Sequence, residues 1–197
     1  MKYIRNSYKK YSKVYNLMFF IISIGFTLGL IVSLFLEEDL IKSLYEYFYN
    51  HINNYNVSTF TNILYPIIIY SSLFIISLTI LGVFIPFLML FIENISIGLI
   101  IGVILKISGL KGLLFGLIYF MFTKLLYILI LIYLILNLYK FVTNLINSLK
   151  NKNNNSIYNL YSRIIIKVLF CIVVILIYNL IGIFIIPKII KLFIFLL

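Results

Sequence analysis

A long apolar stretch without a charged residue is the feature that most constrains what this chain can fold into. From residue 63 to residue 92, thirty consecutive positions include no Lys, Arg, Asp or Glu. Comparable apolar stretches recur along the chain, about five in all, each of a length that suits a bilayer. Because hydrocarbon offers the backbone no hydrogen-bond partner, such stretches must form helices that satisfy their own N–H and C=O groups. The sequence therefore predicts an all-α, multi-pass integral membrane protein.

The composition supports this class and narrows the range of partners. Apolar residues make up 64% of the 197 residues and charged residues 11%, against about 45 to 50% and about 25% in soluble proteins. About five spans and their connectors consume the whole chain, so we expect a single domain covering 1–197. The net charge of +11 is better explained by contact with anionic membrane lipid than by nucleic acid, which we do not expect as a partner.

Three polar segments lie between the apolar stretches. The arm 1–14 carries five Lys or Arg residues with tyrosines between them and is predicted to be cytoplasmic. Segment 37–62 holds four of the five acidic residues and is predicted to be an outer loop; its apolar residues at helical spacing predict a short amphipathic helix. Segment 140–163 is rich in Asn and Lys and is predicted to be a cytoplasmic loop.

The predicted spans follow from these segments and from two turns. Gly82 and Pro86 mark a break in the long uncharged stretch, because a straight helix over it would measure about 45 Å against a hydrocarbon core near 30 Å. Gly109 and Gly112 mark a second turn. The predicted spans are 15–36, 64–84, 87–107, 113–139 and 164–186. Basic residues predominate on the side of the N-terminus, which predicts an N-in/C-out protein of five spans.

The third predicted span carries a helix-packing pattern. Gly98 and Gly102 are four residues apart, and Asn94 precedes them by one turn on the same face. Small residues at this spacing let another helix approach closely, and a buried Asn can hydrogen-bond across the contact. Gly116 and Thr123 are candidates for the facing surface. Two interpretations stay open: packing within the chain, or an interface with a second copy in a homo-oligomer or with a partner protein.

Two charged residues, Glu93 and Lys124, lie well inside the predicted spans. An isolated charge at the bilayer centre costs at least about 2.5 to 3.5 kcal/mol, so each should face protein, a wet cavity or an opposite charge. One interpretation is an ion pair between two helices. A second is a helix break at Lys124, with 110–123 as a short re-entrant helix and the lysine reaching an interface. A third is a proton or ion relay.

The polar residues of the outer segment do not form a pattern that indicates catalysis. Glu37, Glu38, Asp39, Glu46 and His51 lie in one short segment without metal-ligand spacing, which favours a solvated acidic face. No Gly-rich phosphate loop follows a predicted strand. Hydrolase chemistry would need a positioned acid and base or a metal on this side. We therefore expect a non-enzymatic protein without a metal or cofactor.

The order of these features resembles the stage II sporulation protein M family. That order is a basic N-terminus, a first span with Gly25 and Gly29, an outer polar helix, the Gly82/Pro86 break, the Gly98/Gly102 pair and the Gly109/Gly112 turn. The resemblance covers nearly the whole chain and rests on hydropathy and glycine placement. Family members often have Pro followed by His or Gln where this chain reads Phe122-Thr123-Lys124.

The resemblance implies a scaffold of the mother-cell membrane during endospore formation. In that family the protein holds two peptidoglycan-degrading partners at the septum, so that wall remodelling moves the membrane around the forespore. Two alternatives remain: a membrane-spanning subunit of a transporter, favoured by the intramembrane charges and the Pro86 break, and an assembly protein unconnected with sporulation. Neighbouring genes for wall hydrolases would favour the scaffold, and a neighbouring ATPase gene would favour transport.

Overall fold

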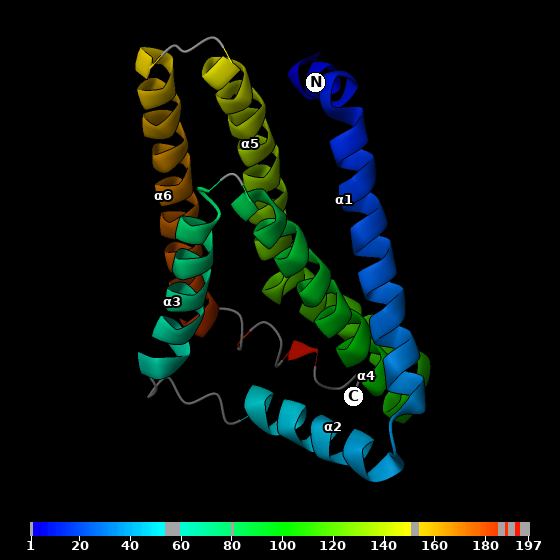
Figure 1. Cartoon of the computed structure of the whole chain (residues 1–197). Coiled ribbons are helices and arrows are strands. Elements are labelled where there is room, and N and C mark those ends of the chain that lie inside the picture. The colour runs from blue at the N-terminus through cyan, green and yellow to red at the C-terminus, as the bar shows by residue number, and fades with distance from the viewer. Residues whose placement is uncertain are drawn as a thin grey trace.

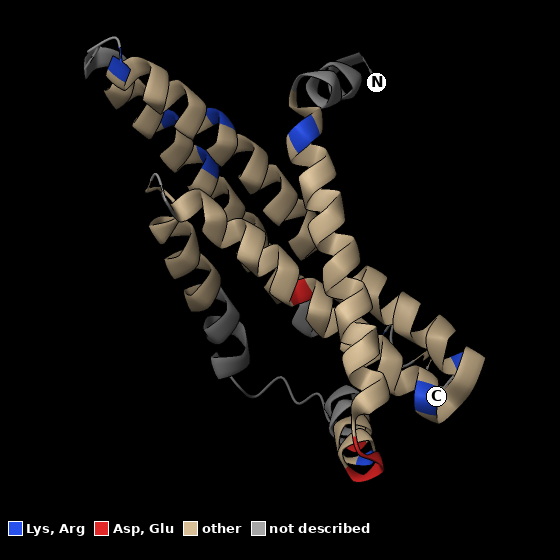
Figure 2. Ribbon diagram, turned by 45° about the vertical axis from the view of Figure 1, so that its right-hand side comes forward, with Lys and Arg blue, Asp and Glu red and all other residues tan. Residues whose placement is uncertain are grey.

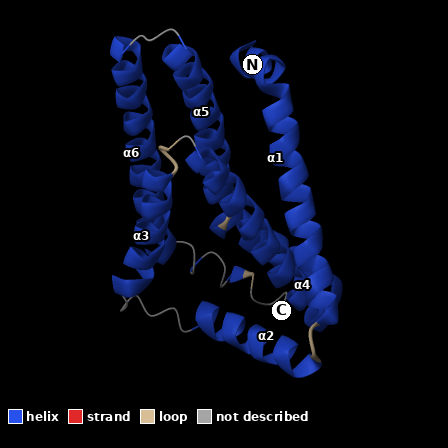
Figure 3. Ribbon diagram, in the orientation of Figure 1, coloured by secondary structure: helices blue, strands red, loops and turns tan. Residues whose placement is uncertain are grey.

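The computed structural model describes residues 2–53, 60–79, 81–150, 154–184, 188 and 192–193. These residues are helical apart from short turns and include no strand (Figure 3), which confirms the all-α prediction. The elements are α1 (Lys2–Phe35), α2 (Glu38–Asn53), α3 (Phe60–Ile76), the short 3-10 helix η1 (Leu81–Val83), α4 (Phe84–Thr123), α5 (Leu125–Lys150) and α6 (Asn154–Phe184).

Four helical segments within the described residues are long and apolar enough to cross a membrane. They are Tyr11–Phe35, Phe84–Thr123, Leu125–Lys150 and Ile157–Ile181. Exposed leucine, isoleucine and phenylalanine side chains cover much of their outer faces, as expected where lipid replaces water as the solvent. The chain has the architecture of a multi-pass membrane protein.

Helices α4 and α5 form the centre of the bundle. Helix α1 packs along α4, α6 packs along α5, and α3 contacts both α6 and α4 (Figure 1). The core between them includes the fully buried residues Leu90, Phe115, Leu131, Leu134 and Leu138. The core is therefore continuous from the first long helix to the last.

Helix α2 lies across the end of the bundle at which α1 ends (Figure 1). It is the amphipathic helix predicted within segment 37–62, and it buries Ile41 while Leu40 and Leu44 stay exposed. Glu38 and Asp39 occupy its first turn, where the positive end of the helix dipole stabilises a carboxylate. Acidic residues thus gather at this end of the molecule.

Helix α4 folds back on itself at Gly109. The backbone there has φ 61° and ψ −144°, a conformation that residues with a side chain rarely adopt. Beyond this turn Gly116 packs against Ile101, and an added Cβ on Gly112 would lie 2.6 Å from the carbonyl oxygen of Ile104. Gly112 was predicted as part of the turn, but it lies in the returning arm, where its missing side chain lets the two arms approach.

The break between α3 and α4 covers more residues than predicted. Helix α3 ends at Ile76, earlier than the expected end at residue 84, and α4 begins at Phe84 rather than at residue 87. The N–H of Gly82 donates to Thr79 Oγ1 at 2.9 Å, and an added Cβ on this glycine would lie 2.6 Å from Ser77 Cα. Pro86 is buried in the first turn of α4. The N–H groups of a first turn have no partner within the helix, so the lack of an N–H in proline costs no helical hydrogen bond there.

The predicted loop at 140–163 is wrong, because most of this segment is helical. Helix α5 continues to Lys150 and α6 begins at Asn154, while 151–153 lie outside the described residues. Phe141 and Leu145 are buried between the two helices, and the ring of Phe141 meets Tyr161 edge-on at 4.9 Å between centroids. Apolar residues at helical spacing thus extend the helix pair through a segment whose composition is polar.

The N-terminal arm is part of a helix, whereas most of the C-terminal tail lies outside the described residues. The arm 1–14 belongs to α1 from Lys2 onward, with a kink at Tyr11 (φ −120°, ψ 26°), and the side chains of residues 1–10 are not described. Helix α6 ends at Phe184. The predicted stop at Pro187 and most of the tail after it lie outside the described residues.

Candidate functional site

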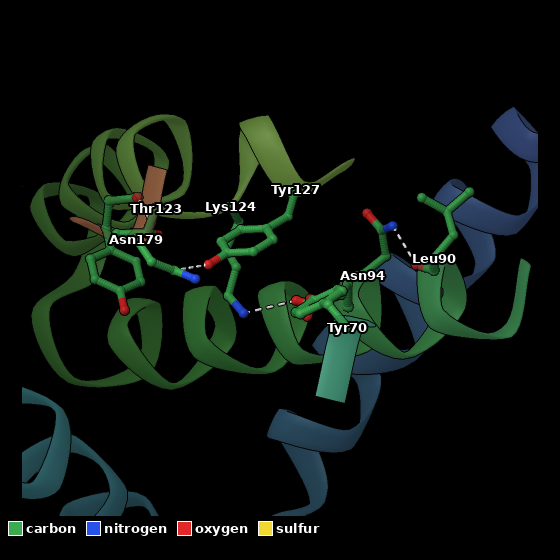
Figure 4. Close-up of polar contacts among 9 residues, drawn as sticks. Tyr70, Leu90, Asn94, Thr123, Lys124, Tyr127 and Asn179 are labelled. Atoms are coloured by element: carbon green, nitrogen blue, oxygen red, sulfur yellow. Dashed lines mark hydrogen bonds and ion pairs between the residues drawn. The ribbon is translucent and has the colours of Figure 1, made fainter. Parts of the chain in front are cut away.

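The two charges inside the bundle form an ion pair. Lys124 Nζ lies 2.8 Å from Glu93 Oε2, and the hydroxyl of Tyr70 donates to the other carboxylate oxygen, Oε1. In Figure 4 the side chain of Lys124 extends toward Tyr70, and a dashed line marks the ion pair of this lysine. The turn at Gly109 is what brings the pair together, because the returning arm of α4 carries residue 124 back beside residue 93. This is the one ion pair found among the described residues.

Lys124 also lies at an interruption between α4 and α5. Its backbone has φ −119° and ψ −26°, its N–H donates to the Phe120 carbonyl, and its own carbonyl accepts from the N–H of Ile128 at 3.2 Å. Helical hydrogen bonding therefore continues across the interruption, so that the returning arm of α4 and α5 form one kinked helix. The predicted ion pair and the predicted break occur at the same residue, and the lysine reaches Glu93 rather than an interface.

Tyrosines surround the pair. The ring of Tyr70 stacks on that of Tyr127 at 5.2 Å between centroids, and Tyr127 meets Tyr178 edge-on at the same separation. The hydroxyl of Tyr127 donates to Asn179 Oδ1, and that of Tyr178 donates to the Phe122 carbonyl near the interruption. These contacts connect α3, α4, α5 and α6 at one depth in the bundle.

A pocket of about 410 Å³ opens beside the pair. Its polar lining consists of Glu93, Lys124, Tyr70 and Tyr127, and its apolar lining of Ile69, Leu73, Met89 and Ile92. Glu93 and Lys124 are largely shielded, with 17% and 27% of their side chains exposed. Each carboxylate oxygen of Glu93 already has a partner, Lys124 for one and Tyr70 for the other. The arrangement can therefore fix α3, α4 and the start of α5 relative to one another. Among the described residues no three His, Cys, Asp or Glu side chains are grouped as metal ligands.

The packing pattern around Gly98 is used within the chain. Gly98 faces Gly29 of α1, and an added Cβ on Gly29 would lie 2.8 Å from the backbone nitrogen of Leu99 and closer still to the carbonyl oxygen of Ile95. Gly102 faces Ser33 of α1, whose side chain an added Cβ on this glycine would overlap. Since both helices meet in the same residue order, α1 and the first arm of α4 run parallel. Close approach of this kind needs small residues on both helices.

The facing surface is not the one that the sequence suggested. It consists of Gly25, Gly29 and Ser33 on α1, whereas Gly116 packs on Ile101 and the hydroxyl of Thr123 donates to the Tyr119 carbonyl at 2.7 Å. Three small residues spaced by four on the first span are a signal from which this surface could have been predicted.

Two further contacts show what sequence reasoning missed. Asn94 is 3% exposed, and its Nδ2 donates to the Leu90 carbonyl of its own helix at 2.7 Å rather than to α1. Tyr70 was not singled out at all, because the chain contains 17 tyrosines and nothing in the local sequence distinguishes this one. Only the position of α3 beside α4 makes it a partner of Glu93.

No model of a known protein family, no curated protein and no solved structure matches this chain. Any functional proposal has to account for the Gly29–Gly98 contact and for the Glu93–Lys124 pair with its tyrosines.

Proposed function

We propose that this chain is a non-enzymatic membrane scaffold, in line with its resemblance to stage II sporulation protein M. The observation that carries the proposal is the closed polar cluster, in which Glu93 has one oxygen bound to Lys124 and the other to Tyr70. A relay group needs a partner with which it can exchange a proton or an ion, whereas these groups satisfy one another. Such a cluster holds helices in place, which is what a scaffold requires.

The partners that this proposal assigns are peptidoglycan-degrading proteins on the wall side of the membrane. The surface offered to them is the end of the bundle formed by α2, with its exposed acidic first turn. The close contact between α1 and α4 supports the role, because α2 follows α1 directly and a rigid α1–α4 pair would hold it in place. The second copy considered from the sequence is not needed for this contact.

The proposed topology has five crossings with the N-terminus inside. It counts α1, α3, the first arm of α4, the returning arm together with α5, and α6. The distribution of charge supports it, because Lys and Arg colour the upper parts of α5 and α6, and most acidic residues lie at the α2 end, which carries fewer basic residues (Figure 2). Basic residues stay preferentially on the cytoplasmic side.

Cysteine labelling tests this topology. With Cys171, the single cysteine, changed to alanine, a new cysteine at Glu46 should react with an impermeant maleimide on intact cells. One at Asn147 should react only after permeabilisation, because the basic end of the bundle stays inside. Both positions are exposed, so accessibility of the side chain does not differ between them. Labelling of the Asn147 position on intact cells would reverse the proposed orientation.

Purification of the chain with its partners tests the scaffold function. The tagged full chain, isolated from membranes of a sporulating host, should carry hydrolase activity that clears a peptidoglycan gel, and an unrelated membrane protein isolated in parallel should not. Deleting the gene should stop membrane migration around the forespore. Normal migration after deletion, with no hydrolase activity on the purified chain, would refute the proposal.

A transporter subunit is the second candidate. One observation favours it: Glu93 and Lys124 line an open-sided pocket next to a helix interruption, and discontinuous helices with charged groups are common in carriers. In a transporter the two side chains would be needed for activity as well as for stability. The combined substitution of both residues separates these roles.

A further inference from the structure

A polar cleft lies at the end of the bundle opposite α2. It has a volume of about 360 Å³ and is lined by Asn144, Asn147 and Ser148 of α5 and by Asn159, Leu160 and Arg163 of α6. Five of these six side chains are polar, against four of the eight that line the pocket beside Glu93. Amides, a hydroxyl and a guanidinium together offer many hydrogen-bond donors within one small space.

The cleft lies in a region of the chain that has no negative charge. The five acidic residues are all in segments 37–46 and 93, whereas residues 125–184 contain Lys140, Lys150, Lys152, Arg163 and Lys167. Arg163 and Lys167 are four residues apart in α6 and therefore lie on the same face of that helix, where like charges repel each other. Figure 2 shows basic residues along the described parts of α5 and α6 with no acidic residue near them. An anion that bound here would relieve the repulsion among the cations.

The depth of the cleft matches that of lipid headgroups. Lys167 Nζ donates to Asn137 Oδ1 at 2.7 Å, and Asn137 is buried, so polar side chains begin to enter the α5–α6 contact at this level. The cleft begins about two turns beyond it. Tyr139 and Tyr158 are exposed nearby, Tyr158 to 77%, and exposed tyrosines are typical of the membrane interface.

We infer that this cleft binds the phosphate group of an anionic membrane lipid. The guanidinium of Arg163 presents paired N–H donors that match two phosphate oxygens, and the amides of Asn144 and Asn159 supply further donors from the two facing helices. Basic clefts between helices at the headgroup level are suited to such lipids. The lipid is favoured over a soluble phosphate because the cleft opens at the depth of the membrane surface. This site is independent of the scaffold function.

Lipid binding by the detergent-solubilised full chain tests this inference. Native mass spectrometry should detect tighter binding of phosphatidylglycerol than of phosphatidylcholine, and excess inorganic phosphate should not displace the lipid. Arg163→Gln should weaken phosphatidylglycerol binding about tenfold, because it removes one paired, charge-assisted contact. Arg163→Lys, which keeps the charge and loses the fork, should give an intermediate loss.

Two further variants separate a built site from diffuse attraction. Lys150→Gln removes the same charge from the same end of the bundle without lining the cleft, and it should weaken binding much less than Arg163→Gln. Asn144→Leu changes no charge and should still weaken binding. Equal losses for Arg163→Gln and Lys150→Gln, equal binding of the two lipids, or displacement by inorganic phosphate would each overturn the inference. All three positions are exposed, so these variants should melt like the wild type.

Discussion

Alanine in place of Gly29 or Gly98 is expected to lower the free energy of unfolding by about 3 kcal/mol. The added methyl group on either residue would overlap backbone atoms of the opposite helix, and backbone cannot move aside as a flexible side chain can. The two helices would have to separate along their whole contact, which also includes Gly102 and Ser33. Leucine at either position should prevent the folded bundle from accumulating in membranes.

Gly116→Ala is the matched control for this prediction. Its added methyl group would approach the Cγ1 atom of the Ile101 side chain at 3.2 Å, and that side chain can adjust, so the loss should be below about 1 kcal/mol. Unfolding of the purified chain in mixed detergent measures all three variants on one scale. Losses at Gly29 and Gly98 no greater than that at Gly116 would show that α1 and α4 do not meet through their backbones.

Removing one partner of the ion pair is expected to have an equally large effect. Glu93→Gln leaves the largely shielded ammonium group of Lys124 without a counter-charge, which should cost about 3 to 5 kcal/mol of stability. Lys124→Met should cost less, because Glu93 keeps the hydrogen bond from Tyr70. Tyr70→Phe should cost about 1.5 to 3 kcal/mol, the usual contribution of a hydrogen bond to a charged group.

The same unfolding measurement checks the order of these three variants. Glu46→Gln serves as the control, since it removes a carboxylate that is exposed on α2 and should change stability by less than about 0.5 kcal/mol. If Glu93→Gln behaved like Glu46→Gln, the pair would have no part in holding the helices together.

The helices and their interruptions could largely be predicted from the sequence, because each follows from local physics. Uncharged stretches of membrane length dictate helices, Gly109 can adopt a backbone conformation that other residues avoid, and Pro86 suits the first turn of a helix. The amphipathic pattern of α2 is likewise local. The helical segment at 140–163 was missed because its polar composition outweighed the apolar spacing of Phe141, Leu145 and their neighbours.

Contacts between distant segments could be predicted only in part. Glu93 and Lys124 were expected to need partners because charge in hydrocarbon is costly. Because their charges have opposite signs, each was a candidate partner for the other. Tyr70 could not be found in this way, since its role depends on where α3 packs and its residue type is common in this chain. The Gly29–Gly98 contact could be predicted in part. Each glycine was noted in the sequence, but the sequence did not say which two helices would pack through them.

The double variant Glu93→Gln/Lys124→Met, compared with both single variants in cells, tests the central claim most directly. If the pair is structural, each single variant leaves one buried charge without a partner, whereas the double variant leaves none. The double variant should therefore regain membrane abundance and the cellular phenotype. In a sporulating host that phenotype is membrane migration around the forespore. Abundance that recovers while the phenotype stays lost would show that a charged group is needed for activity and would contradict the scaffold. Losses that simply add, with no recovery, would show that Glu93 and Lys124 do not interact.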